Sequence, residues 1–249
     1  MESIIEVRDL TKVFVSRGRE IVAVDDVSFD VFRGEIFGMI GPNGAGKSTT
    51  FSMMTTLIKP SSGSIRVSGF DAEKEDHRIR QLIGIVPQKL SLYPDLTARE
   101  NMELMGRLYD VPADVMEERI DYYLKLVGLD DHADRYAGGF SGGMKQRLSV
   151  ICAVLHDPDI LFWDEPTTGL DPQTRQSLWK LARRFNGEGK TLIFTTHYME
   201  EADNLCDRVA VMNLGKLVAL DAPSALKQKS GSSNLEDVFI HLTGKEVRD

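Results

Sequence analysis

The sequence of 249 residues contains only two cysteines, Cys152 and Cys206, and both lie among apolar neighbours. Isolated cysteines in such surroundings are typical of small buried side chains, which argues against a disulfide framework or a cysteine metal site. A chain of this length can bury a stable core without such cross-links. We therefore expect one α/β domain that folds in a reducing compartment.

Long apolar segments are also lacking. No run approaches the roughly 18 apolar residues of a membrane span. The N-terminal residues, MESIIEVRDL, lack the basic segment and the apolar stretch of a signal peptide. These two absences predict a protein of the cytoplasm.

An excess of positive charge is the third absence. The chain has 30 lysines and arginines against 38 acidic residues, which gives a formal net charge of −8. This balance argues against a broad basic surface for DNA, RNA or anionic lipid, so we expect no nucleic acid partner. No sustained heptad pattern is present either, which argues against a long coiled coil.

The apolar residues that are present follow strand patterns in the first third of the chain and again after residue 158. Residues 27–31 and 64–69 alternate apolar with polar side chains, which predicts half-buried antiparallel strands. Residues 35–40 are almost continuously apolar, which is typical of a strand covered on both faces in a parallel sheet. Further strands are expected at 159–164, 191–196 and 208–213.

Helical patterns interrupt these strands. Thr97 and Glu100 have the spacing of a capping box, and apolar residues then recur on one helical stripe up to Gly128. A further helix is expected to end before Pro158. We expect a β subdomain plus α/β core at 1–89 and 158–222, a helical subdomain at 90–157, and a C-terminal tail with a helix at 223–249.

Residues 41–49, GPNGAGKST, lie between the apolar strand at 35–40 and a helical run that begins near Lys47. Glycines allow the backbone to wrap closely so that successive N–H groups point at phosphate oxygens, and the helix N-terminus adds its positive dipole end. In this pattern Lys47 neutralises the outer phosphates and the Ser48 hydroxyl holds Mg²⁺. A plain glycine turn would explain neither the lysine nor the hydroxyl. The residues expected to contact the nucleotide are Gly41, Pro42, Asn43, Gly44, Ala45, Gly46, Lys47, Ser48 and Thr49.

Two acidic residues follow a later buried strand. Residues 160–163 are apolar and lead directly to Asp164 and Glu165, at the strand end where parallel sheets bind ligands. Asp164 fits a magnesium-associated carboxylate, and Glu165 fits the general base that polarises an attacking water. His197 follows the strand at 191–196, where it is placed to hydrogen-bond to the γ-phosphate or to that water. The expected catalytic residues are Lys47, Glu165 and His197.

A second glycine-rich segment, FSGGM at residues 140–144, precedes another helical pattern. Ser141, Gly142 and Gly143 open that helix, so its N-terminal N–H groups make a further site for an anion. Taken alone, the segment is explained equally well as a capped helix turn.

Together these segments resemble, in order, the motifs of the ATP-binding subunit of an ABC (ATP-binding cassette) transporter, over nearly the whole chain. GPNGAGKST is similar to the family's phosphate loop, Gln88 in IVPQ to its Q-loop, FSGGM to its signature, ILFWDE to its second acidic motif, GLDP to its D-loop and TTHYMEEA to its H-loop. The resemblance implies an α/β P-loop NTPase (RecA-like) core with an N-terminal antiparallel β subdomain and an inserted α-helical signature subdomain. It also implies ATP and Mg²⁺ as cofactors, with Gln88 as a sensor and a further metal ligand beside Ser48 and Asp164.

The resemblance further implies a use for the second glycine segment. In this family two subunits stack head to tail, and Ser141, Gly142 and Gly143 of one subunit close over the ATP held by the other. Asp171 is expected to transmit this closure across the dimer. The second subunit is another copy of the chain or a related ATPase. A separate integral membrane permease is implied, with the chain attached to its cytoplasmic face.

Some positions depart from the commoner family pattern. Phe140 and Met144 replace the first and last residues of the usual signature LSGGQ, so no polar contact is assigned to Met144. Phe14 stands where many relatives have tyrosine, and it is expected either to stack on adenine or to be a buried strand residue. The signature, the segment TTGLDP and the closing LEDVFIHLTG resemble most the exporter branch of drug-resistance, polysaccharide and lipid-export ATPases.

Other functions use the same motifs. A chromosome-maintenance or DNA-repair ATPase is opposed by the absence of a coiled-coil pattern, and a translation factor with tandem cassettes is opposed by the single set of motifs. A nucleotide-binding regulatory module without turnover is disfavoured because Glu165 and His197 are both present. The expected function is ATP hydrolysis coupled to transport, with export as the favoured direction.

Overall fold

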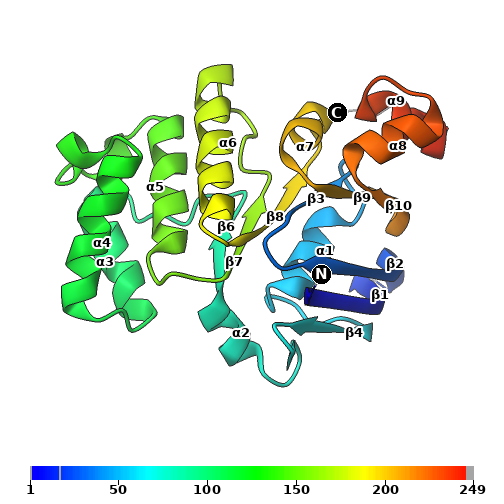
Figure 1. Ribbon diagram of the computed structural model, residues 1–249. Coiled ribbons are helices and arrows are strands. Elements are labelled where there is room, and N and C mark those ends of the chain that lie inside the picture. Colours follow the sequence, from blue (N-terminus) through cyan, green and yellow to red (C-terminus); the bar gives the residue numbers. More distant parts are fainter. Residues whose placement is uncertain (1, 17, 245–249) are drawn as a thin grey trace.

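The computed structural model describes residues 2–16 and 18–244, which form two sheets covered by helices (Figure 1). None of the helices in these described residues is both long enough and apolar enough to cross a bilayer. The helices are α1 (Lys47–Met54), α2 (Asp76–Leu82), α3 (Ala98–Leu108), α4 (Ala113–Leu126), α5 (Gly142–Val154), α6 (Pro172–Gly187), α7 (Met199–Leu205), α8 (Pro223–Ser230) and α9 (Leu235–Thr243), with 3-10 turns at Asp130–His132 and Ala137–Gly139.

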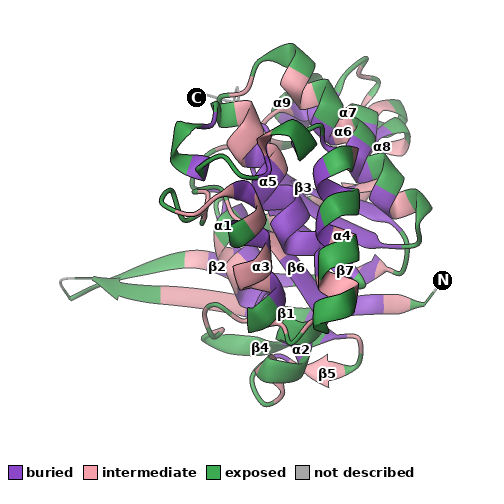
Figure 2. Cartoon of the chain, turned by 90° about the vertical axis from the view of Figure 1, so that its left-hand side faces the viewer, coloured by how far each residue is buried: buried purple, intermediate pink, exposed green. Residues whose placement is uncertain are grey.

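A four-stranded antiparallel sheet is built from the first part of the chain, in the order β2, β1, β4, β5. The predicted antiparallel strand at 27–31 lies within β2, and residues 64–67 of the one predicted at 64–69 lie within β4, with residues 68–69 in the turn that follows, so both strands are confirmed. The far ends of β1 and β2 extend away from the body of the molecule and are exposed (Figure 2). The strands are β1 (Ser3–Ser16), β2 (Arg19–Phe32), β4 (Ser62–Val67) and β5 (Phe70–Asp71).

A six-stranded sheet forms the centre of the molecule, in the order β10, β9, β3, β8, β7, β6. Its neighbouring strands pair in parallel except for the edge strand β10, which is antiparallel to β9. This mixed α/β architecture, with a parallel sheet beside an antiparallel one, confirms the predicted fold class. The strands are β3 (Ile36–Ile40), β6 (Ile83–Val86), β7 (Ile160–Asp164), β8 (Thr191–Thr196), β9 (Arg208–Asn213) and β10 (Lys216–Asp221).

Alternate residues of β7 face two different layers of the molecule. Ile160 and Phe162 lie in the core that α1 and the antiparallel sheet share. Leu161 and Trp163 lie in the core on the opposite face, against α6. Because both faces of β7 are covered, its residues are continuously apolar, and the first polar group appears only at its carboxyl end, Asp164.

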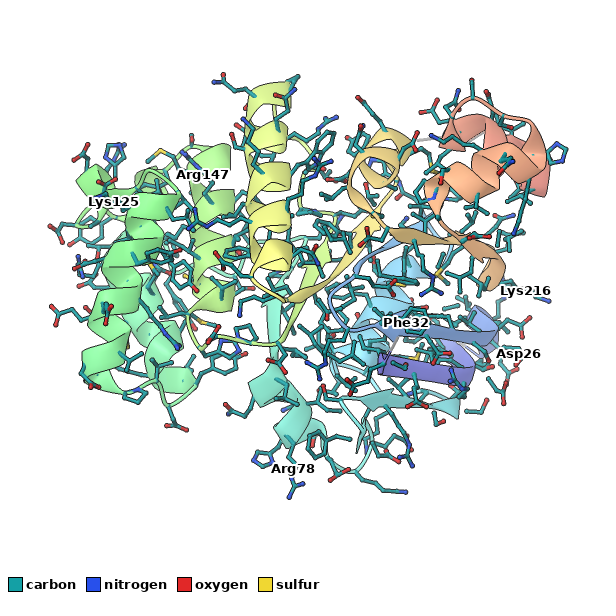
Figure 3. All side chains as sticks on the ribbon, in the orientation of Figure 1. Asp26, Phe32, Arg78, Lys125, Arg147 and Lys216 are labelled. Atoms are coloured by element: carbon teal, nitrogen blue, oxygen red, sulfur yellow. The ribbon has the colours of Figure 1, made fainter. Side chains whose placement is uncertain are left out.

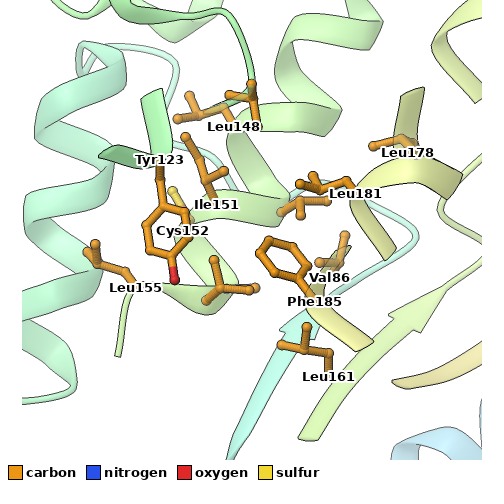
Figure 4. Close-up of a cluster of buried hydrophobic side chains, with 14 of the residues drawn as sticks. Val86, Tyr123, Leu148, Ile151, Cys152, Leu155, Leu161, Leu178, Leu181 and Phe185 are labelled. Carbon is orange, nitrogen blue, oxygen red and sulfur yellow. The ribbon is translucent and has the colours of Figure 1, made fainter. Parts of the chain in front are cut away.

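Helices α3, α4 and α5 gather at one end of the six-stranded sheet (Figure 1). At the start of α3 the Thr97 hydroxyl accepts from the Glu100 N–H (3.1 Å) and the Glu100 carboxylate accepts from the Thr97 N–H (2.7 Å), which confirms the predicted capping box. Tyr123 and Ile151, from α4 and α5, lie in one apolar cluster with Phe185 of α6 (Figure 4). Burial raises the pKa of Tyr123 to about 12. This continuous cluster joins the helices to the core.

The C-terminal helices pack against the opposite edge of the sheet. Leu226 of α8 and Phe239 of α9 share an apolar cluster with Val209 of β9. Residues 223–249, where the sequence predicts a tail with one helix, contain two helices, α8 and α9. Between them Gly231 ends α8 in the left-handed conformation and Asn234 caps α9.

Candidate functional site

The predicted phosphate loop runs from the carboxyl end of β3 to the N-terminus of α1. A Cβ atom added at Gly41 would stand 2.2 Å from the Met212 carbonyl oxygen, and one added at Gly46 would stand 2.6 Å from the Ala23 carbonyl oxygen. Both glycines also have positive φ angles, 151° and 99°. Around Gly44, by contrast, no atom lies within 4 Å of an added Cβ. The loop is therefore held tightly against its own chain on one side and is open on the other.

Lys47 is the first residue of α1 and is almost fully buried, with 4% of its side chain exposed. Its ammonium group donates to the carbonyl oxygens of Gly41 (2.8 Å) and Pro42 (3.1 Å), and it lies 3.7 Å from Oε1 of Glu165. Burial lowers the pKa of Lys47, while the nearby carboxylates of Glu165 and Asp164 oppose that shift. A positive group is thus placed inside the glycine loop next to two acids.

Ser48 and Asp164 meet across the edge of the sheet. The Ser48 hydroxyl donates to Oδ1 of Asp164 at 3.3 Å, and the Thr195 hydroxyl of β8 donates to the same oxygen. Burial raises the pKa of Asp164, and the neighbouring Glu165 carboxylate adds to that effect. A hydroxyl beside a carboxylate is an oxygen donor set that suits Mg²⁺, which usually takes few protein ligands and keeps several waters. Among the described residues, no group of three or more His, Cys, Asp and Glu side chains is placed to hold a metal ion.

Glu165 lies at the centre of the site. Its backbone has a φ of 46°, a conformation that few non-glycine residues adopt, and its N–H donates to the backbone and side-chain oxygens of Thr195 at 3.0 Å each. The carboxylate is buried and its Oε2 accepts from the Gln88 amide (2.9 Å) and the Thr168 hydroxyl (3.3 Å). Nδ1 of His197 lies 3.4 Å from the same oxygen. Together with Lys47, three further side chains, those of Gln88, Thr168 and His197, therefore converge on one carboxylate.

Gln88 contacts the Glu165 carboxylate in this structure. Its amide nitrogen donates to Glu165, and no hydrogen bond from Gln88 to Ser48 or Asp164 occurs in residues 2–16 and 18–244. The hydroxyls of Thr168 and Thr195, which sequence reasoning missed, do contact the two acids. Thr168 follows β7 by a few residues, and Thr195 lies in β8, just before His197. Hydroxyl side chains this close to the motif residues were the feature of the sequence that could have identified them.

Ser141, Gly143 and Asp171 lie together at a second, exposed corner. Ser141 caps α5, because its hydroxyl accepts from the Met144 N–H (3.2 Å). Asp171 caps α6 by accepting from the N–H (2.9 Å) and the hydroxyl (2.6 Å) of Thr174, and these hydrogen bonds lower the pKa of Asp171. A Cβ added at Gly143 would lie 3.0 Å from Thr174, so the two helix N-termini are close neighbours.

No hydrogen bond or ion pair that the described residues make joins this corner to the buried group around Glu165. Gly142 has no atom within 4 Å of an added Cβ, which leaves the start of α5 open. Phe14 is also separate. It lies on β1, is 41% exposed, and has the Lys12 ammonium 5.2 Å from its ring centroid. The structure therefore brings Lys47, Ser48, Gln88, Asp164, Glu165 and His197 together, and it keeps Phe14 and the Ser141 corner apart from them.

Known proteins show the same sequence pattern. A sequence profile of the family described as ABC transporter matches residues 24–168, more than half of the chain. The linearmycin resistance ATP-binding protein LnrL of Bacillus subtilis (strain 168) is 42% identical over 226 residues, which cover 91% of this chain and 71% of that protein. The Nod factor export ATP-binding protein I of Ralstonia nicotianae is 42% identical over 207 residues, covering 83% of this chain and 64% of that protein.

A longer relative is the probable multidrug ABC transporter ATP-binding protein YbhF of Escherichia coli (strain K12). It is 41% identical over 246 residues, which cover 97% of this chain but 42% of that protein, so the chain spans less than half of YbhF.

Solved structures extend the likeness to three dimensions. A structure of the ATP-binding subunit of an ABC transporter has a TM-score of 0.87 at 28% identity and covers 97% of this chain and 100% of that one. A dimeric structure of a post-hydrolysis state of the ATP-binding cassette MJ0796, bound to ADP and Pi, has a TM-score of 0.80 at 27% identity and covers 88% of this chain and 98% of that one. The sequence and structure comparisons are thus consistent with the geometry of the site around Glu165. The chain belongs to the ABC transporter family and is an ATP-binding ATPase.

Proposed function

We propose that this ATPase powers export through a separate membrane permease, and that Glu165 is the base of its reaction. The observation that carries the mechanism is the convergence on Glu165 of Lys47, Gln88, Thr168 and His197 from four separate segments. Export as the direction is supported by relatives that are named for resistance and for export.

In the proposed site the phosphates of ATP lie along residues 41–49, where the glycine backbone is open at Gly44. Lys47 supplies positive charge at the β and γ phosphates. Ser48 and Asp164 would hold Mg²⁺, which neutralises phosphate charge when it is bound. The raised pKa of Asp164 also supports a cation at this position, because a bound cation would stabilise the charged form of a buried carboxylate that lies near another acid.

Glu165 would take a proton from the water that attacks the γ-phosphate. Gln88 and Thr168 donate to its Oε2, so the carboxylate is held in one orientation before the substrate arrives. His197 lies at the same oxygen and would contact the γ-phosphate or the water. The amide nitrogen of Gln88 donates to Glu165, whereas a metal ion would be bound by its amide oxygen, so Gln88 would link the base to Mg²⁺, which suits a residue that senses bound nucleotide.

The exposed corner at Ser141 and Asp171 would serve the ATP of a second subunit, either another copy of the chain or a related ATPase. Two helix N-termini lie side by side there, and the space around Gly142 is open. Neighbouring helix N-termini attract an anion because their free N–H groups and dipoles add. A head-to-tail pair would bring each corner over the other subunit's glycine loop, making two closed sites from two open ones.

The permease would contact the segment that follows Gln88. Asn101, a buried residue of α3, holds this segment through hydrogen bonds from its amide to the carbonyls of Tyr93, Leu96 and Thr97. Tyr93 remains 54% exposed, so the segment offers an aromatic contact on a fixed backbone close to Gln88. Contact there would place the chain at the cytoplasmic face of the membrane.

The first test is the solution mass of Glu165→Gln, measured by light scattering with and without ATP and Mg²⁺. We expect a monomer that becomes a dimer only when both are present, and we expect Lys47→Ala to stay monomeric. A Glu165→Gln chain that binds ATP and stays monomeric would contradict pairing between two copies of the chain. A wild-type chain that binds ATP without hydrolysing it would contradict the role of Glu165.

A further inference from the structure

The His197 ring contacts a neighbouring aromatic ring and makes no hydrogen bond among the described residues. Its Nδ1 is buried and has no hydrogen-bond partner, although Glu165 lies near it, and no other hydrogen bond of the ring occurs in the part of the chain that the structure describes. The ring instead lies against the ring of Tyr198, with centroids 4.1 Å apart and planes inclined by 40°. A histidine in a reaction site is usually oriented by a hydrogen bond to its second nitrogen, so this contact takes the place of that bond.

Tyr198 is in turn covered by a cation from another element. The guanidinium carbon of Arg175, in the second turn of α6, lies 4.8 Å from the centroid of the Tyr198 ring. Nε of Arg175 is buried and has no hydrogen-bond partner among the described residues, and the guanidinium also attracts the buried Glu201 carboxylate. A cation over an aromatic face is attracted by the electrostatic field of the ring, more strongly where water is excluded. Arg175, Tyr198 and His197 therefore form one stack that ends at Glu165.

A second contact joins the same two helices. Trp179 lies one helical turn after Arg175, and its indole N–H donates to Oε1 of Glu201 in α7 at 2.9 Å. Glu201 is 1% exposed, and its other oxygen accepts from the Thr167 hydroxyl at 3.1 Å. Two contacts, one helical turn apart on α6, therefore join α6 to the segment that carries His197.

The N-terminus of α6 links these contacts to the exposed corner at Asp171. The helix begins at the cap Asp171, and the Arg175 N–H donates to the Asp171 carbonyl at 3.0 Å. A displacement of the exposed corner at Asp171 would therefore move Arg175 with it, and through Tyr198 the ring of His197.

We propose that Arg175 and Tyr198 are positioning residues for His197, and that α6 transmits the state of the exposed corner to the catalytic centre through them. The inference rests on the role of His197 in the proposed function. It assigns a purpose to the tyrosine that follows His197 and to an arginine that lies outside the sequence motifs.

The first experiment measures kcat and KM for ATP in the full chain carrying Tyr198→Ala or Tyr198→Phe. Loss of the ring frees His197 to take other orientations, so Tyr198→Ala should lower kcat about tenfold, as displacement of a catalytic group does. KM should change less than about twofold, because the glycine loop is untouched. Tyr198→Phe keeps the stack and should restore kcat to within about twofold of wild type. An unchanged kcat in Tyr198→Ala would overturn the proposal.

A double-mutant cycle separates positioning from mere packing. In a His197→Ala background, Tyr198→Ala should cause no further loss of kcat, because the group it orients is gone. If the same factor is lost again, the tyrosine acts on stability or on another residue, and the proposal is wrong. If His197→Ala alone leaves kcat unchanged while Lys47→Ala abolishes it, the ATPase assignment stands and both the role of His197 and this inference fail.

Arg175→Gln gives a second route that keeps every ring in place, in case Tyr198→Ala does not fold. We expect kcat to fall about threefold to fivefold, in line with the loss of one cation–π contact. Arg78 is the matched control, since it lies on the outer side of α2 (Figure 3) and covers the Phe70 ring at 5.2 Å far along the chain from His197. Arg78→Gln should leave kcat unchanged, and equal effects of the two substitutions would contradict a specific role for Arg175.

Discussion

The two glycine-rich segments of this chain both lead into a helix N-terminus, but their surroundings differ. At residues 41–49 the backbone is pressed against its own chain, with positions for a Cβ at Gly41 and Gly46 only 2.2 and 2.6 Å from carbonyl oxygens. At residues 140–144 a Cβ added at Gly142 would meet no atom within 4 Å. The first segment forms a phosphate-binding loop enclosed by residues of the same chain, whereas the second is open and can be covered by another molecule.

The acids at the two segments differ in the same way. Asp164 is partly buried beside Glu165, and burial raises its pKa. Asp171 is exposed, and the hydrogen bonds from Thr174 lower its pKa. The charge of Asp164 is unfavourable until a cation approaches, while the charge of Asp171 is already satisfied within the chain. The comparison indicates that the first region is built for chemistry and the second for contact.

The largest expected effect concerns the acid at the centre of the first region. Glu165→Gln keeps the hydrogen bonds of the site but removes the base, so kcat should fall about 1,000-fold while ATP binding stays within about twofold. Steady-state turnover and calorimetric ATP binding measure the two quantities. Glu188→Gln is the control, because Glu188 is a surface residue paired with Arg184. A loss of less than tenfold in kcat would contradict the role of Glu165 as the base.

The contact expected at residues 140–144 can be disrupted without changing the phosphate loop at residues 41–49. Ser141→Arg places a long cation at the start of α5, where it should prevent the second subunit from closing. We expect kcat to fall about 100-fold, because the second subunit's contribution to the site is lost. ATP binding to the monomer, measured by equilibrium titration, should not change. Ser233→Arg adds the same charge in an exposed C-terminal loop and should leave turnover unaffected; dimer formation by Ser141→Arg would contradict the comparison.

Backbone strain offers a stability test of the same comparison. Gly46→Ala combines a positive φ with a clash against the Ala23 carbonyl and should lower the free energy of unfolding by about 1–3 kcal/mol. Gly142→Ala meets no atom and adds a better helix former, so stability should stay unchanged or rise by up to about 1 kcal/mol. Urea unfolding of both variants gives the two values, and equal losses would show that the two segments are not different in kind.

The smallest effects concern how the two aspartates respond to pH. Because its folded-state pKa is raised, the Asp164 carboxylate destabilises the nucleotide-free chain at neutral pH, and this penalty disappears as the pH falls below the unfolded value near 3.9. The lowered pKa of Asp171 has the opposite sign, so its contribution is present at neutral pH and is lost as the pH falls through its folded-state value.

Asp164→Asn should therefore raise the melting temperature at pH 7, and Asp171→Asn should lower it slightly, since asparagine is also a good cap. Scanning calorimetry at neutral and acid pH should show both differences shrinking in acid. Shifts of the same sign in the two variants would be inconsistent with the contrast drawn between the two sites.

Much of the buried site could be predicted because its residues follow apolar strands. Lys47 comes after β3, Glu165 after β7 and His197 after β8, and parallel strands bring their carboxyl ends to one edge of the sheet. Their juxtaposition is therefore a consequence of the strand pattern, while their roles stay predictions. β6 and α2 were not anticipated, since both are short, four and seven residues, and neither has a clear periodicity.

By itself the amino-acid sequence determined the buried strands at β3, β7, β8 and β9, the cap of α3 and the position of the glycine loop, because each depends on neighbouring residues. Only the tertiary structure decided that Gln88 and Thr168 bind the Glu165 carboxylate and that Arg175 covers Tyr198. These contacts depend on side-chain rotamers and on the packing of elements that are distant in sequence. The physical reason is that periodicity specifies which face of an element is buried, whereas the identity of the group it meets there is set by how the layers pack.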